Sequence, residues 1–313
     1  MSRGCISFCG HHSGSLVHRG SKSRPLAGAL AQHHNCLHHT HYEIAMRLFA
    51  GCDLLLEATE VCPTVAMLRP RSGAAQWLAS ESYCFDPPLR PTEYVDVYGN
   101  LCQRFTIAPG TLRIQWSAIV ETDDQIAVEP HAEAIPVSEL PDDALQFLLQ
   151  SRYCPSDAMQ EQAQKIAGAA APGYAQVEAI RTWIHANMEY RYGVSDETTD
   201  ALDSLEQRAG VCRDFSHIGI SLCRAIGIPA RMVVGYLYQL EPMDLHAWFE
   251  AYLGGRWYTF DGTQIEPRGG RIVVAYGRDA ADVAFISNYG ALTTKSLRAW
   301  VQLDSGRPLF QER

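Results

Sequence analysis

The sequence predicts an α+β fold, in which a small β-rich unit is followed by a unit that contains several helices and a hairpin of two strands. Three observations indicate this class. Residues 47–122 alternate apolar and polar side chains between turn signals, much of residues 158–225 shows helical periodicity, and residues 231–261 contain strand-like runs. The 313 residues are enough for about two domains.

We expect the chain to divide into three segments. Residues 1–45 form a histidine-rich N-terminus outside the fold, residues 46–138 form the β-rich unit, and residues 139–313 form the helix–sheet unit. The N-terminus holds eight of the twelve histidines. A Cys/His tract can bind zinc, but Cys5 and Cys9 have no second well-spaced ligand pair. We therefore expect no metal and no cofactor, and we expect this segment to be disordered or to lie upstream of a natural start at Met46.

The composition disfavours several classes of protein. The formal net charge is -9, whereas a nucleic-acid-binding protein is expected to show a basic patch. No run approaches the ~20 apolar residues of a membrane helix, and no apolar segment typical of a secretory signal is present. The ten cysteines are scattered and do not resemble a disulfide framework. These features favour a cytoplasmic location, where a thiol stays reduced.

The β-rich unit is predicted from alternation and turns. Apolar residues alternate along two runs that are separated by Pro109-Gly110, and Tyr98-Gly99-Asn100 marks another turn. The alternating residues are Phe105, Ile107, Leu112, Ile114 and Trp116. We expect a small antiparallel sandwich or barrel without chemistry of its own.

The middle of the chain predicts a connection followed by helices. Residues 123–155 are interrupted by four prolines, with a short helix expected over 141–149. Helices are expected over 158–169 and 174–188, separated by Pro172-Gly173. In the second helix, Val177, Ile180 and Met188 fall at helical spacing with Trp183 or Ile184.

Cys212 is predicted to lie in the first turn of an amphipathic helix. Apolar residues recur at intervals of three and four from Val211 to Ala225, and Gly227 with Pro229 ends the pattern. A helix N-terminus lowers the pKa of a thiol and offers free N–H groups to an oxyanion. Cys223, in the last two turns of the same helix, gains none of this. Cys212 is therefore the candidate nucleophile, although most cysteines are simply small buried apolar residues.

A hairpin after this helix is predicted to bring a histidine and a carboxylate together. Gly254-Gly255 joins two strand-like runs, residues 246–253 and 256–261. With these glycines as a two-residue turn, Trp248 pairs with Asp261, so His246 and Asp261 share a face as diagonal neighbours about 5.5 to 8 Å apart. The remaining histidines outside the N-terminus fit less well: His131 is in the connection, His185 is on a packing helix, and His217 faces away from Cys212.

The residues around these three positions resemble the transglutaminase-like superfamily. The resemblance covers roughly residues 46–290. It extends to the bacterial members of the family, which often carry a β-rich N-terminal domain. It rests on three blocks in the order Cys, His, Asp, with support from flanking segments. The blocks are Gly210-Val211-Cys212-Arg213-Asp214-Phe215, His246-Ala247-Trp248 and Phe260-Asp261-Gly262-Thr263, and the flanks are Tyr190-Arg191-Tyr192, Gly227-Ile228-Pro229-Ala230-Arg231 and residues 276–284.

The resemblance implies a papain-like core, in which the cysteine helix packs on an antiparallel sheet that carries the histidine and the aspartate. It also implies Cys212 as nucleophile, His246 as base and Asp261 as the group that orients the base. The family usually has proline where this chain has Gly262, a change expected to alter loop stiffness and not the carboxylate. The family also implies a second oxyanion donor from an upstream aromatic or amide side chain. Trp183 and Tyr192 are the candidates here.

These inferences predict a thiol enzyme that hydrolyses a peptide, isopeptide or side-chain amide bond through a thioester. Protein-glutamine acyl transfer to an amine stays open, because it shares that thioester and differs only in the second nucleophile. An interaction protein on the same scaffold is a further alternative, although such a protein would typically have lost one of the three residues. A zinc-binding module on the N-terminus is the least favoured. We expect a peptide or protein substrate, and neither a nucleic acid nor a membrane as partner.

Overall fold

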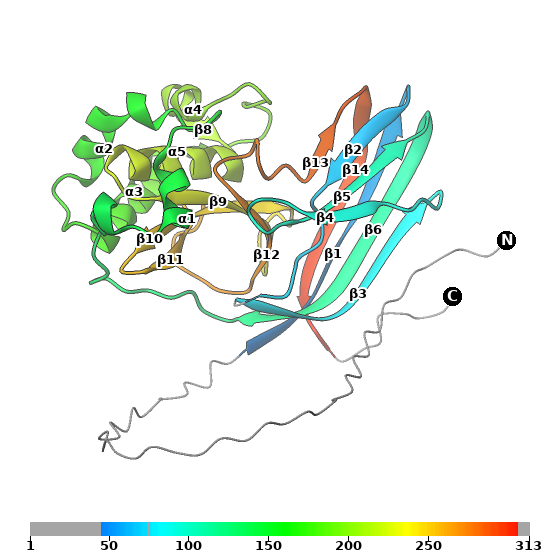
Figure 1. The fold of residues 1–313 in the computed structure, drawn as a ribbon, viewed down its shortest axis with the longest axis horizontal. Helices are drawn as coiled ribbons and strands as arrows, with labels where there is room; N and C mark the ends of the chain where they lie inside the picture. Colours follow the sequence, from blue (N-terminus) through cyan, green and yellow to red (C-terminus); the bar gives the residue numbers. More distant parts are fainter. Residues whose placement is uncertain (1–44, 74, 306–313) are drawn as a thin grey trace, which may run out of the picture.

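The computed structural model describes residues 45–305 except residue 74. The chain forms two units, a β-rich unit and a helix–sheet unit, that lie side by side (Figure 1). The α+β fold class predicted from the sequence is confirmed. Residues 1–44 of the histidine-rich N-terminus, for which the sequence predicts disorder and no zinc site, lie outside the described residues.

Two four-stranded antiparallel sheets make up the β-rich unit, with strand orders β14-β1-β6-β3 and β13-β2-β5-β4. The predicted apolar alternation explains them, because Leu112, Ile114 and Trp116 are all buried on one face of β6. The strands are β1 (Ala45–Ala58), β2 (Cys62–Ala66), β3 (Gln76–Asp86), β4 (Thr92–Val95), β5 (Leu101–Ile107), β6 (Gly110–Asp123), β13 (Ile286–Asn288) and β14 (Leu292–Leu303).

The last strands of the chain correct the predicted division into units. β14 pairs with β1 along its length, from Leu48 opposite Leu303 to Ala58 opposite Leu292, and β13 pairs with β2. Residues 286–303 therefore belong to the β-rich unit, although the division at 138/139 assigned them to the helix–sheet unit. Strand pairing across more than 200 positions leaves no local signal in the sequence, which is why the division missed it.

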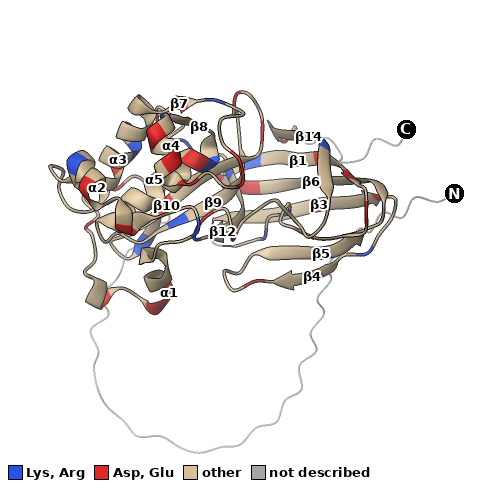
Figure 2. Ribbon diagram, turned by 90° about the horizontal axis from the view of Figure 1, so that it is seen from above, with Lys and Arg blue, Asp and Glu red and all other residues tan. Residues whose placement is uncertain are grey.

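Helices form one layer of the second unit, at the left of Figure 1. The helix expected over 141–149 is a short α-helix followed by a 3₁₀ turn, whereas those expected over 158–169 and 174–188 match α2 and α3 closely. α4 was not predicted. The helices are α1 (Asp142–Leu145), α2 (Gln160–Ala167), α3 (Tyr174–Asn187), α4 (Ala201–Gln207) and α5 (Cys212–Ala225), with 3₁₀ turns at Val137–Glu139, Gln146–Leu148 and Ser156–Ala158. Figure 2 shows acidic residues gathered on this layer, including around α4.

The sheet of this unit has the order β11-β10-β9-β12 and is antiparallel throughout. Its strands are β9 (Ala230–Leu237), β10 (His246–Leu253), β11 (Arg256–Phe260) and β12 (Arg271–Gly277), and a short parallel pair, β7 (Glu189–Tyr190) and β8 (Ala209–Gly210), lies at the start of α5. α5 packs closely on β10 because Gly219 has no side chain: a Cβ there would lie 2.4 Å from the Phe249 ring. α5 and the sheet therefore form the core that positions the site.

Side-chain amides of the β-rich unit complete the free edge of β12. Gln76 donates to the Val273 carbonyl (2.7 Å) and accepts from the Val273 N–H (2.8 Å). Asn100 makes the same pair of bonds with the backbone of Tyr276, at 2.7 and 2.8 Å. Because each amide mimics one residue of a neighbouring strand, the two units are joined without continuing the sheet.

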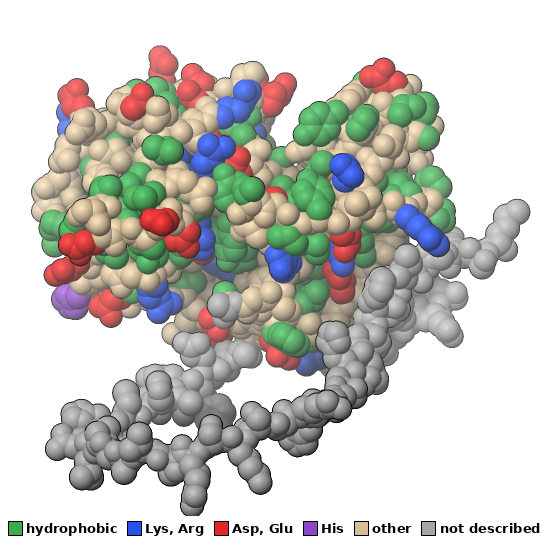
Figure 3. All heavy atoms as spheres, in the orientation of Figure 1, with side chains coloured by type: hydrophobic (Ala, Val, Ile, Leu, Met, Phe, Trp, Pro, Cys, Tyr) green, Lys and Arg blue, Asp and Glu red, His purple; other side chains and the backbone are tan. Residues whose placement is uncertain are grey.

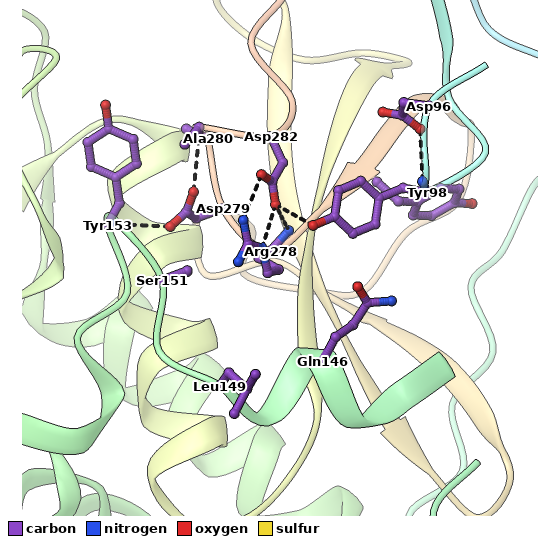
Figure 4. A network of polar contacts seen from close by, with 12 residues as sticks. Asp96, Tyr98, Gln146, Leu149, Ser151, Tyr153, Arg278, Asp279, Ala280 and Asp282 are labelled. Atoms are coloured by element: carbon purple, nitrogen blue, oxygen red, sulfur yellow. Dashed lines mark hydrogen bonds and ion pairs between the residues drawn. The ribbon is translucent and has the colours of Figure 1, made fainter. Parts of the chain in front are cut away.

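A second connection runs through the loop after β12, which Figure 4 shows from close by. Tyr98 donates its hydroxyl to Asp282 (2.8 Å), which also accepts from the Arg278 side chain. Asp279 accepts the backbone N–H of Tyr153 at 2.8 Å. Figure 3 shows that a notch still separates the outer surfaces of the two units. None of the helices in the described ranges is long and apolar enough to cross a membrane.

Candidate active site

Cys212 is the first residue of α5, as the sequence predicted. The buried carboxylate of Asp214 accepts the N–H of Val211 (2.8 Å) and the hydroxyl of Ser195 (2.6 Å), which fixes the start of the helix. Gly210 leaves room for that carboxylate, because a Cβ at this position would lie 2.6 Å from the Asp214 Cβ. Gly210, the backbone of Val211 and the carboxylate of Asp214 thus help to place the thiol at the helix N-terminus.

The surroundings of Cys212 differ from those of the buried cysteines. Its side chain is partly exposed, whereas Cys52, Cys154 and Cys223 are buried. Burial raises the pKa of Cys52 to about 11 and that of Cys154 to about 12, so these thiols stay protonated and unreactive. Cys212 instead lies at the N-terminus of α5, where the N–H groups of the first turn have no acceptors within the helix.

The hairpin that carries the other two residues has the predicted register. Leu253 pairs with Arg256 and Phe249 with Phe260. Gly254 and Gly255 have φ values of +54° and +90°, as a two-residue turn with positive φ at both positions requires. This register places Asp261 so that its Oδ2 lies 2.8 Å from Nε2 of His246. The predicted contact between the imidazole and the carboxylate is therefore present.

Asp261 is buried and accepts hydrogen bonds on both oxygens. Thr263 donates its backbone N–H (3.0 Å) and its hydroxyl (2.7 Å) to Oδ1, while Arg271 donates to Oδ2 (2.9 Å). Burial alone would raise the pKa of Asp261, but the charges of His246 and Arg271 outweigh it and hold the pKa well below its usual range. The carboxylate is therefore ionised at every pH at which the protein is expected to be folded.

His246 is also buried, and its ring stacks against Trp248 with the centroids 6.0 Å apart. Burial alone would lower its pKa, but the charge and hydrogen bond of Asp261 and the neighbouring Cys212 thiol raise the pKa to about 9. The imidazole thus interacts with the thiol on one side and with the carboxylate on the other. This arrangement favours transfer of the thiol proton to His246.

The tyrosine beside Cys212 is Tyr190, which the sequence analysis did not select. The parallel pairing of Tyr190 with Gly210 brings it to the start of α5. Its hydroxyl lies near the thiol and the backbone N–H of Cys212. Burial, together with the negative charge of a Cys212 thiolate, raises the pKa of Tyr190, so the hydroxyl stays protonated and can donate. The one available signal was the segment 190–192, in which every second residue is a tyrosine.

The two oxyanion candidates chosen from the sequence occupy other places. Tyr192 is 54% exposed and packs its ring against Tyr190 at 5.5 Å. Trp183 lies on α3, partly buried against the core, and its indole nitrogen has no hydrogen-bond partner among the described residues. Tyr190, and not either of these two side chains, is the aromatic residue that lies beside Cys212.

Two of the remaining described histidines, His185 and His217, have structural contacts. A ring nitrogen of His185 lies 3.1 Å from the carbonyl oxygen of Gly262, next to Asp261. His217 is fully buried, accepts the N–H of Ala280 (3.2 Å) and stacks on Tyr153, and burial lowers its pKa to about 4. In the part of the chain that the structure describes, no group of three His, Cys, Asp or Glu side chains is arranged to hold a metal.

Gly262 has a steric reason for replacing the proline that is usual in the family. A Cβ at this position would lie 2.6 Å from Cγ2 of Ile184 on α3. The chain therefore packs α3 closer to the aspartate loop than a proline ring would allow.

A cavity of about 680 Å³ lies elsewhere, lined by Trp248, Glu250 and Arg271, and none of Cys212, His246 and Asp261 borders it.

Comparison with known proteins agrees with this arrangement. The family model described as the transglutaminase-like superfamily matches residues 160–262. The crystal structure of a proposed cysteine protease from Cytophaga hutchinsonii is 35% identical, has a TM-score of 0.79, and covers 86% of this chain and 94% of its own.

Curated relatives are mycobacterial and uncharacterised. A protein of Mycobacterium leprae is 32% identical over 236 residues, covering 70% of this chain and 83% of its own length. One from Mycobacterium tuberculosis is 28% identical over 246 residues, covering 69% and 77%. With the fold, the three sequence blocks and these matches in agreement, the chain belongs to the transglutaminase-like superfamily.

Proposed function

We propose that this protein is a cysteine-dependent hydrolase of amide bonds, acting on a peptide, isopeptide or side-chain amide. The observation that carries the proposal is the convergence of three elements. The thiol of Cys212 begins α5, His246 interacts with it, and Asp261 binds the far nitrogen of the imidazole at 2.8 Å. The similarity to a proposed cysteine protease supports hydrolysis over other reactions of a thioester.

The chemistry follows from these positions. The Cys212 thiolate attacks the carbonyl carbon, forming a C–S bond, while His246 holds the thiol proton. The tetrahedral oxyanion accepts the backbone N–H of Cys212 and the Tyr190 hydroxyl. His246 then gives its proton to the leaving amine as the C–N bond breaks, which leaves a thioester. A water molecule, deprotonated by His246, attacks the thioester and releases the acid and the thiol.

Asp261 has two roles in this sequence of steps. It fixes the orientation of the ring through Nε2, so that the other nitrogen of His246 points to the thiol and the leaving group. It also stabilises the imidazolium that exists between the two proton transfers. Because Asp261 is buried and hydrogen-bonded on both oxygens, it performs these roles without changing its own protonation.

The test uses the wild type, Cys212→Ala and, as matched control, Cys84→Ala. Cys84 is the other described cysteine that is not fully buried. Each protein is incubated with a library of fluorescent peptides containing internal amides, isopeptides and glutamine, with and without a primary amine, and products are identified by mass. We expect cleavage or ammonia release by the wild type and by Cys84→Ala, and none by Cys212→Ala.

The outcomes separate the alternatives. Amine incorporation at the expense of hydrolysis would identify an acyltransferase. A second measurement follows iodoacetamide labelling by peptide mass spectrometry. If no substrate turns over and Cys212 is labelled no faster than Cys84, the proposal is wrong and the scaffold alternative is favoured.

A further inference from the structure

The oxygen of Asp261 that binds His246 also binds a second cation. Oδ2 lies 2.8 Å from Nε2 of His246 and 2.9 Å from Nη2 of Arg271. Arg271 begins β12, which pairs with β9 and not with the hairpin of His246 and Asp261. Its side chain is only 6% exposed, so water screens its charge poorly. The carboxylate thus faces two positive groups when His246 is protonated.

Arg271 is not required to hold Asp261 in place. Thr263 binds Oδ1 twice, and His246 binds Oδ2, so the carboxylate keeps three hydrogen bonds without the arginine. Arg271 is itself held independently, because its Nε donates to the carbonyl of Arg268 (3.1 Å) and its guanidinium lies 4.9 Å from the Trp248 ring centroid. What Arg271 adds to Asp261 is therefore mainly charge.

The effect of that charge on His246 has a definite sign. The distances to the shared oxygen place the two nitrogens within about 6 Å of each other, and like charges at this separation disfavour the charged form of a titrating group. The charged or titratable groups around His246 and Asp261 come from several elements. They are Arg271 from β12, Cys212 from α5, Tyr190 from β7, Glu178, Arg181 and His185 from α3, Glu250 from β10, and Glu241, Glu266 and Arg268 from loops. Arg271 is the cation among them that is bonded to Asp261.

We propose that Arg271 acts through Asp261 as a counter-charge that limits how far into the alkaline range His246 stays protonated. This rests on the roles assigned to His246 and Asp261 in the proposed function. The imidazolium must form when the thiol gives up its proton and must then release that proton to the leaving amine. By sharing the carboxylate with His246, Arg271 keeps the imidazolium acidic enough for this second step.

The test compares two substitutions that keep a donor but differ in charge. Arg271→Gln removes the charge and Arg271→Lys retains it, while Arg271→Met provides a second neutral variant whose apolar chain fits against Trp248. The protonation of His246 is followed by NMR of protein with ¹³C-labelled histidine, and the signal is assigned from its absence in His246→Gln. Variants whose thermal melts show loss of the fold are set aside, and either neutral variant suffices.

We expect the titration midpoint of His246 to rise by about one pH unit in Arg271→Gln or Arg271→Met, and to stay near that of the wild type in Arg271→Lys. A fall in the neutral variants would show that Arg271 only holds Asp261 in position, and this would overturn the proposal. Equal midpoints in all variants would overturn it as well. The readout needs no turnover, so a failure to find amide hydrolysis leaves this result distinct.

Discussion

Replacing Asp261 by asparagine removes the charge that keeps His246 protonated in a buried position. In the wild type the pKa of His246 is raised from 6.5 to about 9. Each pH unit corresponds to about 1.4 kcal/mol, so the protonated histidine stabilises the folded protein by about 3 kcal/mol. Because the folded pKa is the higher one, this contribution is fully present below pH 6.5 and is lost as the pH rises through 9.

In Asp261→Asn, burial remains and lowers the pKa of His246, so the variant lacks this dependence. Urea denaturation of both proteins at pH 6 and pH 10 isolates the effect, since all other titrating groups are common to the two. We expect the difference in free energy of unfolding between wild type and variant to shrink by about 3 kcal/mol from pH 6 to pH 10. A difference that stays constant between these pH values would refute the assigned link between His246 and Asp261.

Two further predictions concern the surroundings of the thiol. Tyr190→Phe removes a donor from the proposed oxyanion site, so it should lower kcat by about 10²-fold with little change in KM. The control variant Tyr192→Phe should leave kcat nearly unchanged. Equal effects of the two substitutions in a peptide hydrolysis assay would contradict the assignment of Tyr190. Gly262→Pro should lower the free energy of unfolding by about 1–3 kcal/mol, because the Cβ of the proline would collide with Ile184. If this contact is the cause, adding Ile184→Ala to the same chain should restore part of the lost stability in a thermal melt.

The parts of the site that sequence reasoning could predict are those with local signals. The Cys212 helix follows from its apolar spacing and its stop at Gly227, which adopts a φ of +81°. The position of Asp261 relative to His246 follows from counting outward from the two glycines, since a two-residue turn fixes the register. Both inferences depend on residues close together in the sequence.

The parts that were missed depend on distant pairing. Tyr190 reaches Cys212 only through a two-residue parallel bridge to Gly210, which is too short to leave a pattern. Arg271 reaches Asp261 from β12, whose neighbour in the sheet is β9. The periodicity of a strand shows which residues share a face, but it does not show which strand lies beside it.

The pairing of β1 with β14 has a consequence for the order in which the molecule can assemble. The first described strand and the last one lie side by side. In the sequence, the whole helix–sheet unit is inserted between strands of the β-rich unit. During synthesis, β1 therefore emerges long before its neighbour β14 and leaves one edge of its sheet open in the meantime. The helix–sheet unit has all of its own strands by residue 277 and can fold first. The site would then form before the β-rich unit closes, with the amides of Gln76 and Asn100 sealing the edge of β12 as a late step.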